Sequence, residues 1–169
     1  MAGDNTPIPM EIVGVRVELP SNQPIVLLRE EGGSRYLPIW IGASEATAIA
    51  TAMEGVQPPR PLTHDLMRSI IDAVGALPVR VVITEMRDSV FFADLSLEVS
   101  GEETKVSSRH SDAIALAVRT GTPVFAAPSV LEEAAVHFED EDEEEQVAQF
   151  REFLEEVTVE DFLGGEQEQ

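Results

Sequence analysis

The chain contains two similar seven-residue phrases, 67 residues apart. The first copy, at residues 44–50, reads S-E-A-T-A-I-A, and the second, at 111–117, reads S-D-A-I-A-L-A. Each copy follows β-rich sequence and opens a segment with the apolar spacing of an amphipathic helix. The repeat therefore predicts a duplicated unit, in which strands lead into a helix that begins at a serine followed by an acid.

Both halves of the chain show the same order of predicted elements. In the first half, hydrophobic patterning predicts three strands ahead of the helix, at 11–19, 25–28 and 36–41. In the second half, it predicts strands at 79–86, 90–99 and 104–107. Pro38 indicates an edge position or a bulge in the third strand. We expect an α+β fold of two β-β-β-α units packed in layers, because one helix cannot cover a sheet face alone.

Three prolines at 58, 59 and 61 separate the units and lead into a connecting helix. We predict that Thr63 caps this helix, that Gly75 ends it, and that its apolar face consists of Met67, Ile70, Ile71 and Val74. After the second unit, residues 122–126 predict a short strand, and Ser129 and Glu132 have the spacing of a capping box. The expected domain spans about 10–136, with the repeated units at about 10–55 and 78–121.

The acidic charge of the chain is concentrated at its C-terminal end. The formal net charge is -21, but 14 acids and one arginine lie from His137 onward, which leaves about -8 for the rest. Residues 137–145 predict a solvated acidic linker. In the following tail, at 146–163, Val147, Phe150, Leu154 and Val157 predict an amphipathic helix that needs a partner surface. An acidic body disfavours a general nucleic-acid surface, although a small basic cleft remains compatible with it.

The composition predicts a cytoplasmic protein without a membrane anchor. A chain of 169 residues, 43% of them hydrophobic, is long enough to bury a core. It has no cysteine, which excludes disulfides and thiolate chemistry and fits a cytosolic protein. No apolar run approaches the length of a membrane span, and the first residues lack the basic and apolar regions of a signal peptide.

Two polar clusters in the first half contain residues that suit chemistry. Ser44 and Glu45 open the first repeated helix, where the structural interpretation is a cap with an acid at the positive helix end. Arg60, His64 and Asp65 lie within six positions. His64 suits general acid–base catalysis, and Asp65 suits orienting it or binding a cation. The alternative is a polar helix start.

The third cluster precedes the second repeated helix. Arg109 suits bidentate binding of a phosphate, and the backbone N–H groups around Ser111 add to an anion site. Asp112 suits a divalent cation. The alternative is again a helix cap, with Arg109 paired to an acid. The chain lacks a Walker loop, zinc-ligand spacing, a nucleophile elbow and a dinucleotide fingerprint, so no organic cofactor is implied.

Three phrases of the chain together resemble the bifunctional nuclease domain family. They are L-P-I-W-I-G at 37–42, R-P-L-T-H-D-L at 60–66 and R-H-S-D-A-I-A-L-A at 109–117. The resemblance covers about 10–136, and residues 157–162 are similar to the tail of actinobacterial members. It implies nuclease activity on RNA and DNA, as described for plant members, and an oligomeric assembly. The family pattern usually has proline where this chain has His110, which either adds a base beside Arg109 or is a neutral change.

The first functional hypothesis is a metal-assisted nuclease. In it the catalytic residues are His64, Asp65, Arg109 and Asp112, the substrate is bound by Arg60, Arg109 and Ser111, and Mg²⁺ or Mn²⁺ is held by Asp112 and Glu45. The second hypothesis is a non-catalytic binding or regulatory module that assembles as a homodimer or larger oligomer. In that second hypothesis the serine–acid pairs are caps and the charged clusters are subunit contacts. As chemistry, the second copy of the repeated phrase is the half worth mutating, because it directly follows Arg109 and His110, and the first copy is mainly scaffold.

Overall fold

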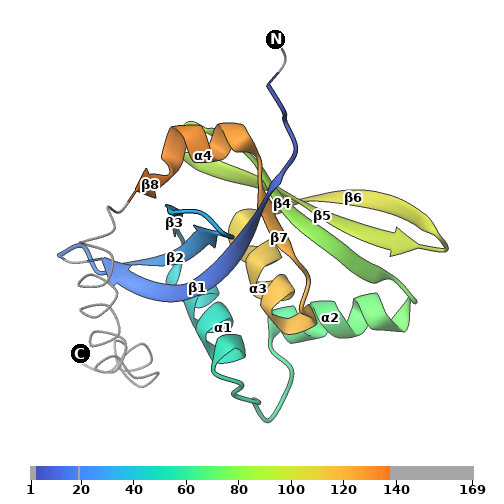
Figure 1. Ribbon diagram of the computed structural model, residues 1–169. Coiled ribbons are helices and arrows are strands. Elements are labelled where there is room, and N and C mark those ends of the chain that lie inside the picture. Colours follow the sequence, from blue (N-terminus) through green and yellow to red (C-terminus); the bar gives the residue numbers. More distant parts are fainter. Residues whose placement is uncertain (1–2, 19, 138–169) are drawn as a thin grey trace, which may run out of the picture.

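Two β-β-β-α units follow one another in the computed structural model, which describes residues 3–18 and 20–137. The first unit consists of β1 (Ile8–Glu18), β2 (Gln23–Glu30), β3 (Arg35–Trp40) and α1 (Ala43–Met53). The second unit consists of β4 (Leu77–Arg87), β5 (Val90–Val99), β6 (Glu102–Arg109) and α3 (His110–Thr120). The predicted α+β fold of duplicated units is confirmed (Figure 1).

Four further elements connect and complete the units. They are α2 (Thr63–Ala73), β7 (Val124–Ala126), α4 (Pro128–Ala134) and β8 (Val136–His137). None of the helices within residues 3–18 and 20–137 is long and apolar enough to cross a membrane. The predicted acidic linker past residue 137 and the predicted helical tail at 146–163 lie outside the described residues.

The strands of the described residues form one eight-stranded sheet, in the order β6-β5-β4-β7-β1-β2-β3-β8. Each unit contributes an antiparallel meander, and β7 joins the two meanders. Val124 of β7 pairs with Met10 of β1 in antiparallel register and with Val81 of β4 in parallel register. β7 therefore completes a continuous sheet, which places β3 and β6 near its opposite ends.

The two repeated helices form the centre of the core. α1 and α3 pack against each other and against the sheet, and α2 lies beside α3 (Figure 1). The repeated phrase supplies side chains that are buried in one core cluster, among them Ala46 and Ile49 on α1 and Ala113 and Leu116 on α3. Alanine at the crossing lets two helices approach closely. Each buried isoleucine or leucine contributes about 1.5–3 kcal/mol through burial.

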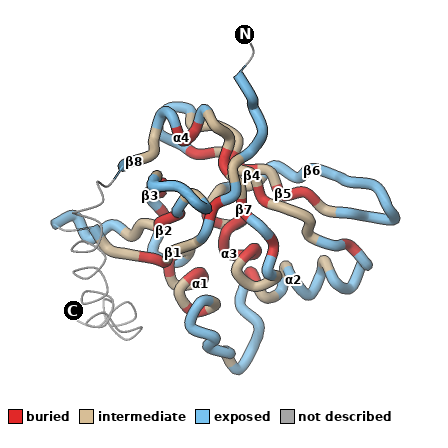
Figure 2. Tube along the Cα trace, viewed as in Figure 1, coloured by how far each residue is buried: buried red, intermediate tan, exposed pale blue. Residues whose placement is uncertain are grey.

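The two units bury their third strands to very different extents. In β3, Leu37 and Ile39 are fully buried, and β8 and α4 pack against this strand. In β6, every residue is exposed except Ser108, as Figure 2 shows along the edge of the sheet. β8 pairs only with Arg35 and Tyr36 of β3, so the outer side of Pro38 has no strand partner among the described residues. The predicted edge position of Pro38 is confirmed.

The helices begin one or two residues before the predicted caps. The N-cap positions of α1, α2 and α3 are Gly42, Leu62 and Arg109, so the predictions of Ser44, Thr63 and Ser111 as caps are wrong. The predicted capping box at Ser129 is also wrong, since α4 begins at Pro128 without a side-chain cap. In each of the first three helices the third position is instead an acid, which favours the positive end of the helix.

The predicted apolar face of α2 is divided between the core and the surface. Met67 and Ile71 pack against the core, whereas Ile70 and Val74 are exposed. The exposed side chains continue a four-residue spacing that we call the α2 stripe, consisting of Leu62, Leu66, Ile70 and Val74. α2 contacts α3 and β4, which cover only one side of it.

Candidate functional site

Arg109 joins the starts of the two repeated helices. Its guanidinium contacts the Asp112 carboxylate in a bidentate manner, at 2.8 Å from Nε to Oδ2 and 3.1 Å from Nη2 to Oδ1. Nη2 also lies 3.1 Å from Oε1 of Glu45. Glu45 and Asp112 occupy corresponding positions of the two copies, so one arginine of the second unit binds the matching acids of both units.

His64 approaches the same carboxylate from α2. Its Nε2 atom lies 3.0 Å from Oδ1 of Asp112, although the two residues are 48 positions apart in the chain. His64 is only 7% exposed, so the ring is enclosed between α2 and α3. The structure therefore brings together His64, Arg109, Asp112 and Glu45, a set that we call the Arg109 cluster.

Asp65 and Arg60 lie in other surroundings. Asp65 accepts a hydrogen bond from Nε of Arg119 at 2.8 Å and another from the Leu62 N–H at 2.9 Å. Arg119 is almost completely buried, so this pair fastens α2 onto α3 and thereby holds His64 in place. Arg60 is exposed in the connection before α2, and none of the contacts given for the described residues joins it to the Arg109 cluster.

The charges of the Arg109 cluster stabilise one another. Burial alone raises the pKa of Asp112, but hydrogen bonds from Arg109 and His64 together lower it below the ordinary value of an aspartate. The hydrogen bond between Arg109 and Asp112, together with the negative charge of Asp112, raises the pKa of Arg109. Hydrogen bonds from Leu62 and Arg119 lower the pKa of Asp65. Near neutral pH, Asp112 and Arg109 are therefore an ionised pair.

A cavity of about 430 Å³ opens next to the Arg109 cluster. Arg109 is 65% exposed and lines the cavity, together with Trp40 and the first residues of α1 and α3. Both helix N-termini present backbone N–H groups, which favour anions. Its lining residues are Asn22, Gln23, Pro24, Trp40, Ile41, Gly42, Ala43, Arg109, His110 and Ser111.

His110 connects the two units through its ring. Nε2 lies 3.0 Å from the carbonyl oxygen of Trp40 in the first unit, and Nδ1 lies 3.3 Å from that of Phe91 in the second. The ring also packs edge-on against Phe91, with centroids 5.7 Å apart. Burial lowers the pKa of His110 against the opposing effect of the two carbonyl oxygens. His110 thus holds the two halves together at the cavity.

The carboxylates of the cluster do not form a metal centre in this arrangement. Within the described part of the chain, no group of three or more His, Cys, Asp or Glu side chains is placed to hold a metal ion. Glu45 and Asp112 both contact Arg109, whose charge already compensates them. The donor set therefore does not fit a protein-held Mg²⁺ or Mn²⁺ ion, and no chemical step is assigned to one.

Some residues of this region could not be recognised from the sequence. Arg119 lies in the last turn of α3, where a basic residue simply favours the negative helix end. Asn22 and Gln23 lie at a turn between strands, and only the fold places them beside Trp40. Trp40 could have been recognised as a candidate binding residue from the sequence, because a large aromatic residue just before a helix start is suited to ligand contact.

Comparison with known proteins supports the family expected from the three phrases. Residues 26–139 match the model of the bifunctional nuclease domain. The chain is 47% identical over 161 residues to an uncharacterized protein of Mycobacterium tuberculosis, Rv1829, covering 90% of this chain and 96% of that protein. It is 32% identical over 112 residues to bifunctional nuclease 2 of Arabidopsis thaliana, covering 63% of this chain and 34% of that protein.

A second plant relative gives a similar result. Bifunctional nuclease 1 of Arabidopsis thaliana is 32% identical over 103 residues, covering 59% of this chain and 32% of the plant protein. The aligned part thus corresponds to about one third of each plant protein. The family match at 26–139 includes all four residues of the Arg109 cluster. The chain belongs to the bifunctional nuclease domain family.

Proposed function

We propose that this chain is a nuclease that hydrolyses phosphodiester bonds of RNA and DNA at the Arg109 cluster. The observation that carries the proposal is that Arg109, an exposed cation, lies at a cavity where two helix N-termini meet. A phosphate diester is the anion that such a site suits, because guanidinium and backbone N–H groups bind its oxygens together. The names of the plant relatives agree with this assignment.

Substrate positioning follows from the lining of the cavity. Arg109 and the N–H groups near Ser111 bind the scissile phosphate, while the exposed Trp40 ring stacks on a neighbouring base. Asn22 and Gln23 provide amide groups for base edges. The negative net charge of the chain opposes binding of a long polyanion, so short single strands are the expected substrates.

Proton transfer in this proposal uses the Asp112–His64 pair. Water attacks phosphorus, the bond to the leaving oxygen breaks, and the proton of the water passes to Asp112. His64, which is buried behind Asp112, holds the carboxylate in position and shares that proton. The leaving oxygen takes a proton from solvent. In this scheme His64 is a positioning residue and not the group that contacts the water.

Cleavage assays test the proposal directly. Purified protein is incubated with labelled single-stranded RNA and DNA, in Mg²⁺, in Mn²⁺ and in EDTA. We expect Asp112→Asn to reduce the rate by at least about 100-fold, whereas Asp88→Asn, in an exposed turn, leaves it unchanged. Equal cleavage by both variants identifies a contaminating nuclease and rejects the proposal. The EDTA arm separately decides between the sequence-based expectation that Mg²⁺ or Mn²⁺ assists and the structural inference that the cluster holds no metal ion.

The α2 stripe favours a second candidate function, a homo-oligomeric binding module without catalysis. Four apolar side chains in one row on an exposed helix are typical of a face that contacts another protein surface. We expect a dimer or larger assembly that dissociates when Ile70 and Val74 are both changed to aspartate. Ala73→Asp, exposed on the same helix but outside the stripe, is the control. Light scattering that finds a monomer in every case rejects this candidate.

A further inference from the structure

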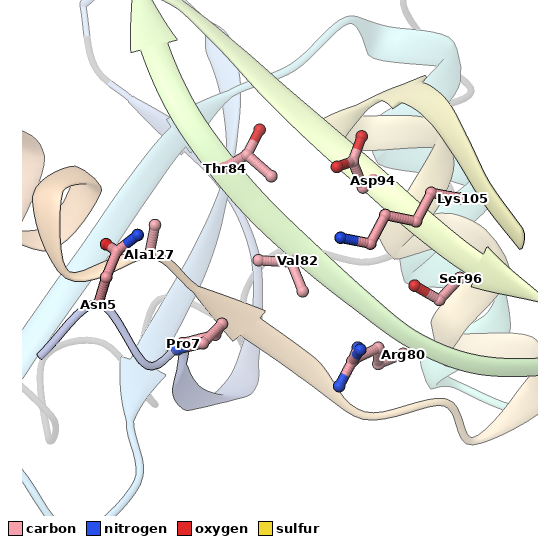
Figure 3. A pocket seen from close by; sticks show the side chains of 9 residues that line it. All are labelled: Asn5, Pro7, Arg80, Val82, Thr84, Asp94, Ser96, Lys105 and Ala127. Atoms are coloured by element: carbon pink, nitrogen blue, oxygen red, sulfur yellow. The ribbon is translucent and has the colours of Figure 1, made fainter. Parts of the chain in front are cut away.

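A second cavity lies on β4, β5 and β6, and its lining shares no residue with the cavity at Arg109. It has a volume of about 400 Å³, within the range of small-molecule sites. Figure 3 shows Asp94, Ser96 and Lys105 on one side of it, with Asn5 and Pro7 of the N-terminal segment on the other and Val82 between them. We propose that this cavity binds a small zwitterion of the α-amino acid class.

The cavity contains two charges of opposite sign without partners. Asp94 and Lys105 make no side-chain hydrogen bond or ion pair with any described residue. They are diagonal neighbours on adjacent strands, since Lys105 pairs with Ser96 and Asp94 lies two residues before Ser96 on the same face. Asp94 and Lys105 are close neighbours of opposite charge that do not pair with each other. They therefore leave room for a ligand that carries both a positive and a negative group.

The neighbouring charges strengthen this interpretation. Arg80 also lines the cavity, but its guanidinium is paired with Glu103 at 2.8 Å. The remaining charges are therefore one cation and one anion. A phosphate or a nucleotide would be repelled by Asp94, and a neutral sugar would leave both charges uncompensated. An ammonium group beside Asp94 and a carboxylate beside Lys105 satisfy both.

The polar floor of the cavity is formed by Ser96. This residue is 1% exposed, and its hydroxyl has no hydrogen-bond partner within residues 3–18 and 20–137. Its hydroxyl is not one of the fully buried polar atoms that lack a partner among these residues, so it is hydrated from the cavity. A ligand carboxylate can replace that water as the acceptor of its hydrogen bond. Val82, Pro7 and Ala127 add an apolar surface for an aliphatic side chain.

The composition makes Lys105 unusual. The chain has ten arginines but only this one lysine. Most arginines whose contacts are given form ion pairs with acids, as their planar fork favours, whereas Lys105 does not. A single lysine also provides a selective chemical probe, because an amine-reactive reagent can modify the chain only there and at the N-terminus.

Calorimetric titration of the full chain with each of the twenty L-amino acids tests the proposal. We expect at least one to bind more tightly than about 1 mM. Its amide, which lacks the carboxylate, and its deaminated acid, which lacks the ammonium group, should each bind at least about tenfold more weakly. Binding of the deaminated acid as tight as that of the amino acid overturns the proposal, as does the absence of any binder.

Variants locate the binding. Lys105→Gln and Asp94→Asn should each weaken amino-acid binding at least about tenfold. Arg87→Gln, at the exposed end of β4, and Asp88→Asn, in the turn that follows, should not. The bound amino acid should also slow amine modification of Lys105 but not of the N-terminus, as read by peptide mass spectrometry. Binding that survives both cavity variants places the ligand elsewhere and rejects this assignment, independently of any nuclease activity at Arg109.

Discussion

The first and second units have the same order of elements but serve different purposes. In the first unit, β8 and α4 cover the third strand, and its helix start supplies one acid to the Arg109 cluster. In the second unit the third strand is open, and Arg109, His110 and Asp112 all lie where this strand meets its helix. Duplication thus provides two equivalent scaffolds, and the proposed site lies mainly in the one that is less enclosed.

The third strands allow the comparison at single corresponding positions. Ile39 is fully buried, and Val106, 67 residues later, is 43% exposed. Pro38 is likewise replaced by Lys105, the unpaired cation of the second cavity. The second unit has therefore exchanged apolar burial in this strand for exposed and charged side chains.

The largest expected effect comes from truncating these two positions. Ile39→Ala should lower the free energy of unfolding by about 2–5 kcal/mol, because it leaves a cavity in the core. Val106→Ala should change it by less than about 0.5 kcal/mol, as for other surface positions. Urea denaturation of both variants measures the difference. Isoleucine has one methylene more than valine, which is worth about 0.8 kcal/mol and does not account for the expected difference between the two variants.

A large loss in Val106→Ala would contradict the comparison. If that loss also grows with dilution of the protein, the edge at β6 is covered by another copy in solution, which agrees with the oligomeric candidate. If the loss does not depend on concentration, β6 is more enclosed than the described residues indicate.

The cleavage rate should depend differently on the two acids that contact Arg109. Asp112 contacts both Arg109 and His64, whereas Glu45 contacts only the arginine of this cluster. We expect Asp112→Asn to lower the cleavage rate by at least about 100-fold and Glu45→Gln by less than about tenfold. Single-turnover assays on the same labelled RNA compare them. Equal losses would show that the copies contribute equally and that the second is not the functional one.

The pH dependence of folding should reveal the contribution of the ionised Asp112 carboxylate. The folded-state pKa of Asp112 is below its ordinary value, so its stabilisation is complete above about pH 4 and is lost as the pH falls through the folded-state pKa. Wild type should therefore lose more unfolding free energy than Asp112→Asn as the pH falls from about 5 to about 3. Urea denaturation across this range measures it, with Asp88→Asn as the control.

The architecture could be predicted well from the sequence because the repeated residues are the ones that pack in the core. Ala46, Ile49, Ala113 and Leu116 showed both the spacing and the duplication, and each is buried where α1 meets α3. Predicted strand limits differ from the observed ones by up to three residues at most ends, because backbone pairing continues past the apolar core of a strand.

Contacts between distant segments could not be predicted from the sequence. The four residues of the Arg109 cluster had been singled out, but pairing of His64 with Asp112 depends on how α2 packs on α3. The predicted caps Ser44 and Ser111 are wrong because serine favours the N-cap in general, whereas here β6 runs directly into α3 and only two residues separate β3 from α1. The pairing of Asp65 with Arg119 could not be predicted either, because the two residues are 54 positions apart in the chain.

The smallest expected effect concerns His110, where the two units touch. A neutral imidazole donates from one nitrogen only, yet both ring nitrogens face carbonyl oxygens. Protonation would satisfy both oxygens, but it would also place a charge in a buried position next to Arg109. The pKa of His110 is lowered because burial outweighs the two hydrogen bonds, so the folded protein holds this ring neutral.

The lowered pKa of His110 determines whether the stability of the protein rises or falls with pH. Below about pH 6.5 the unfolded chain binds a proton that the folded chain does not, so the stability of wild type should fall relative to His110→Gln as the pH drops from about 7 to about 5. Thermal unfolding at several pH values measures this, with His137→Gln, at an exposed position, as the control. A relative gain in stability would mean that the Trp40 and Phe91 carbonyls outweigh burial. His110 would then be a charged clamp, and the joint between the units would tighten in acid.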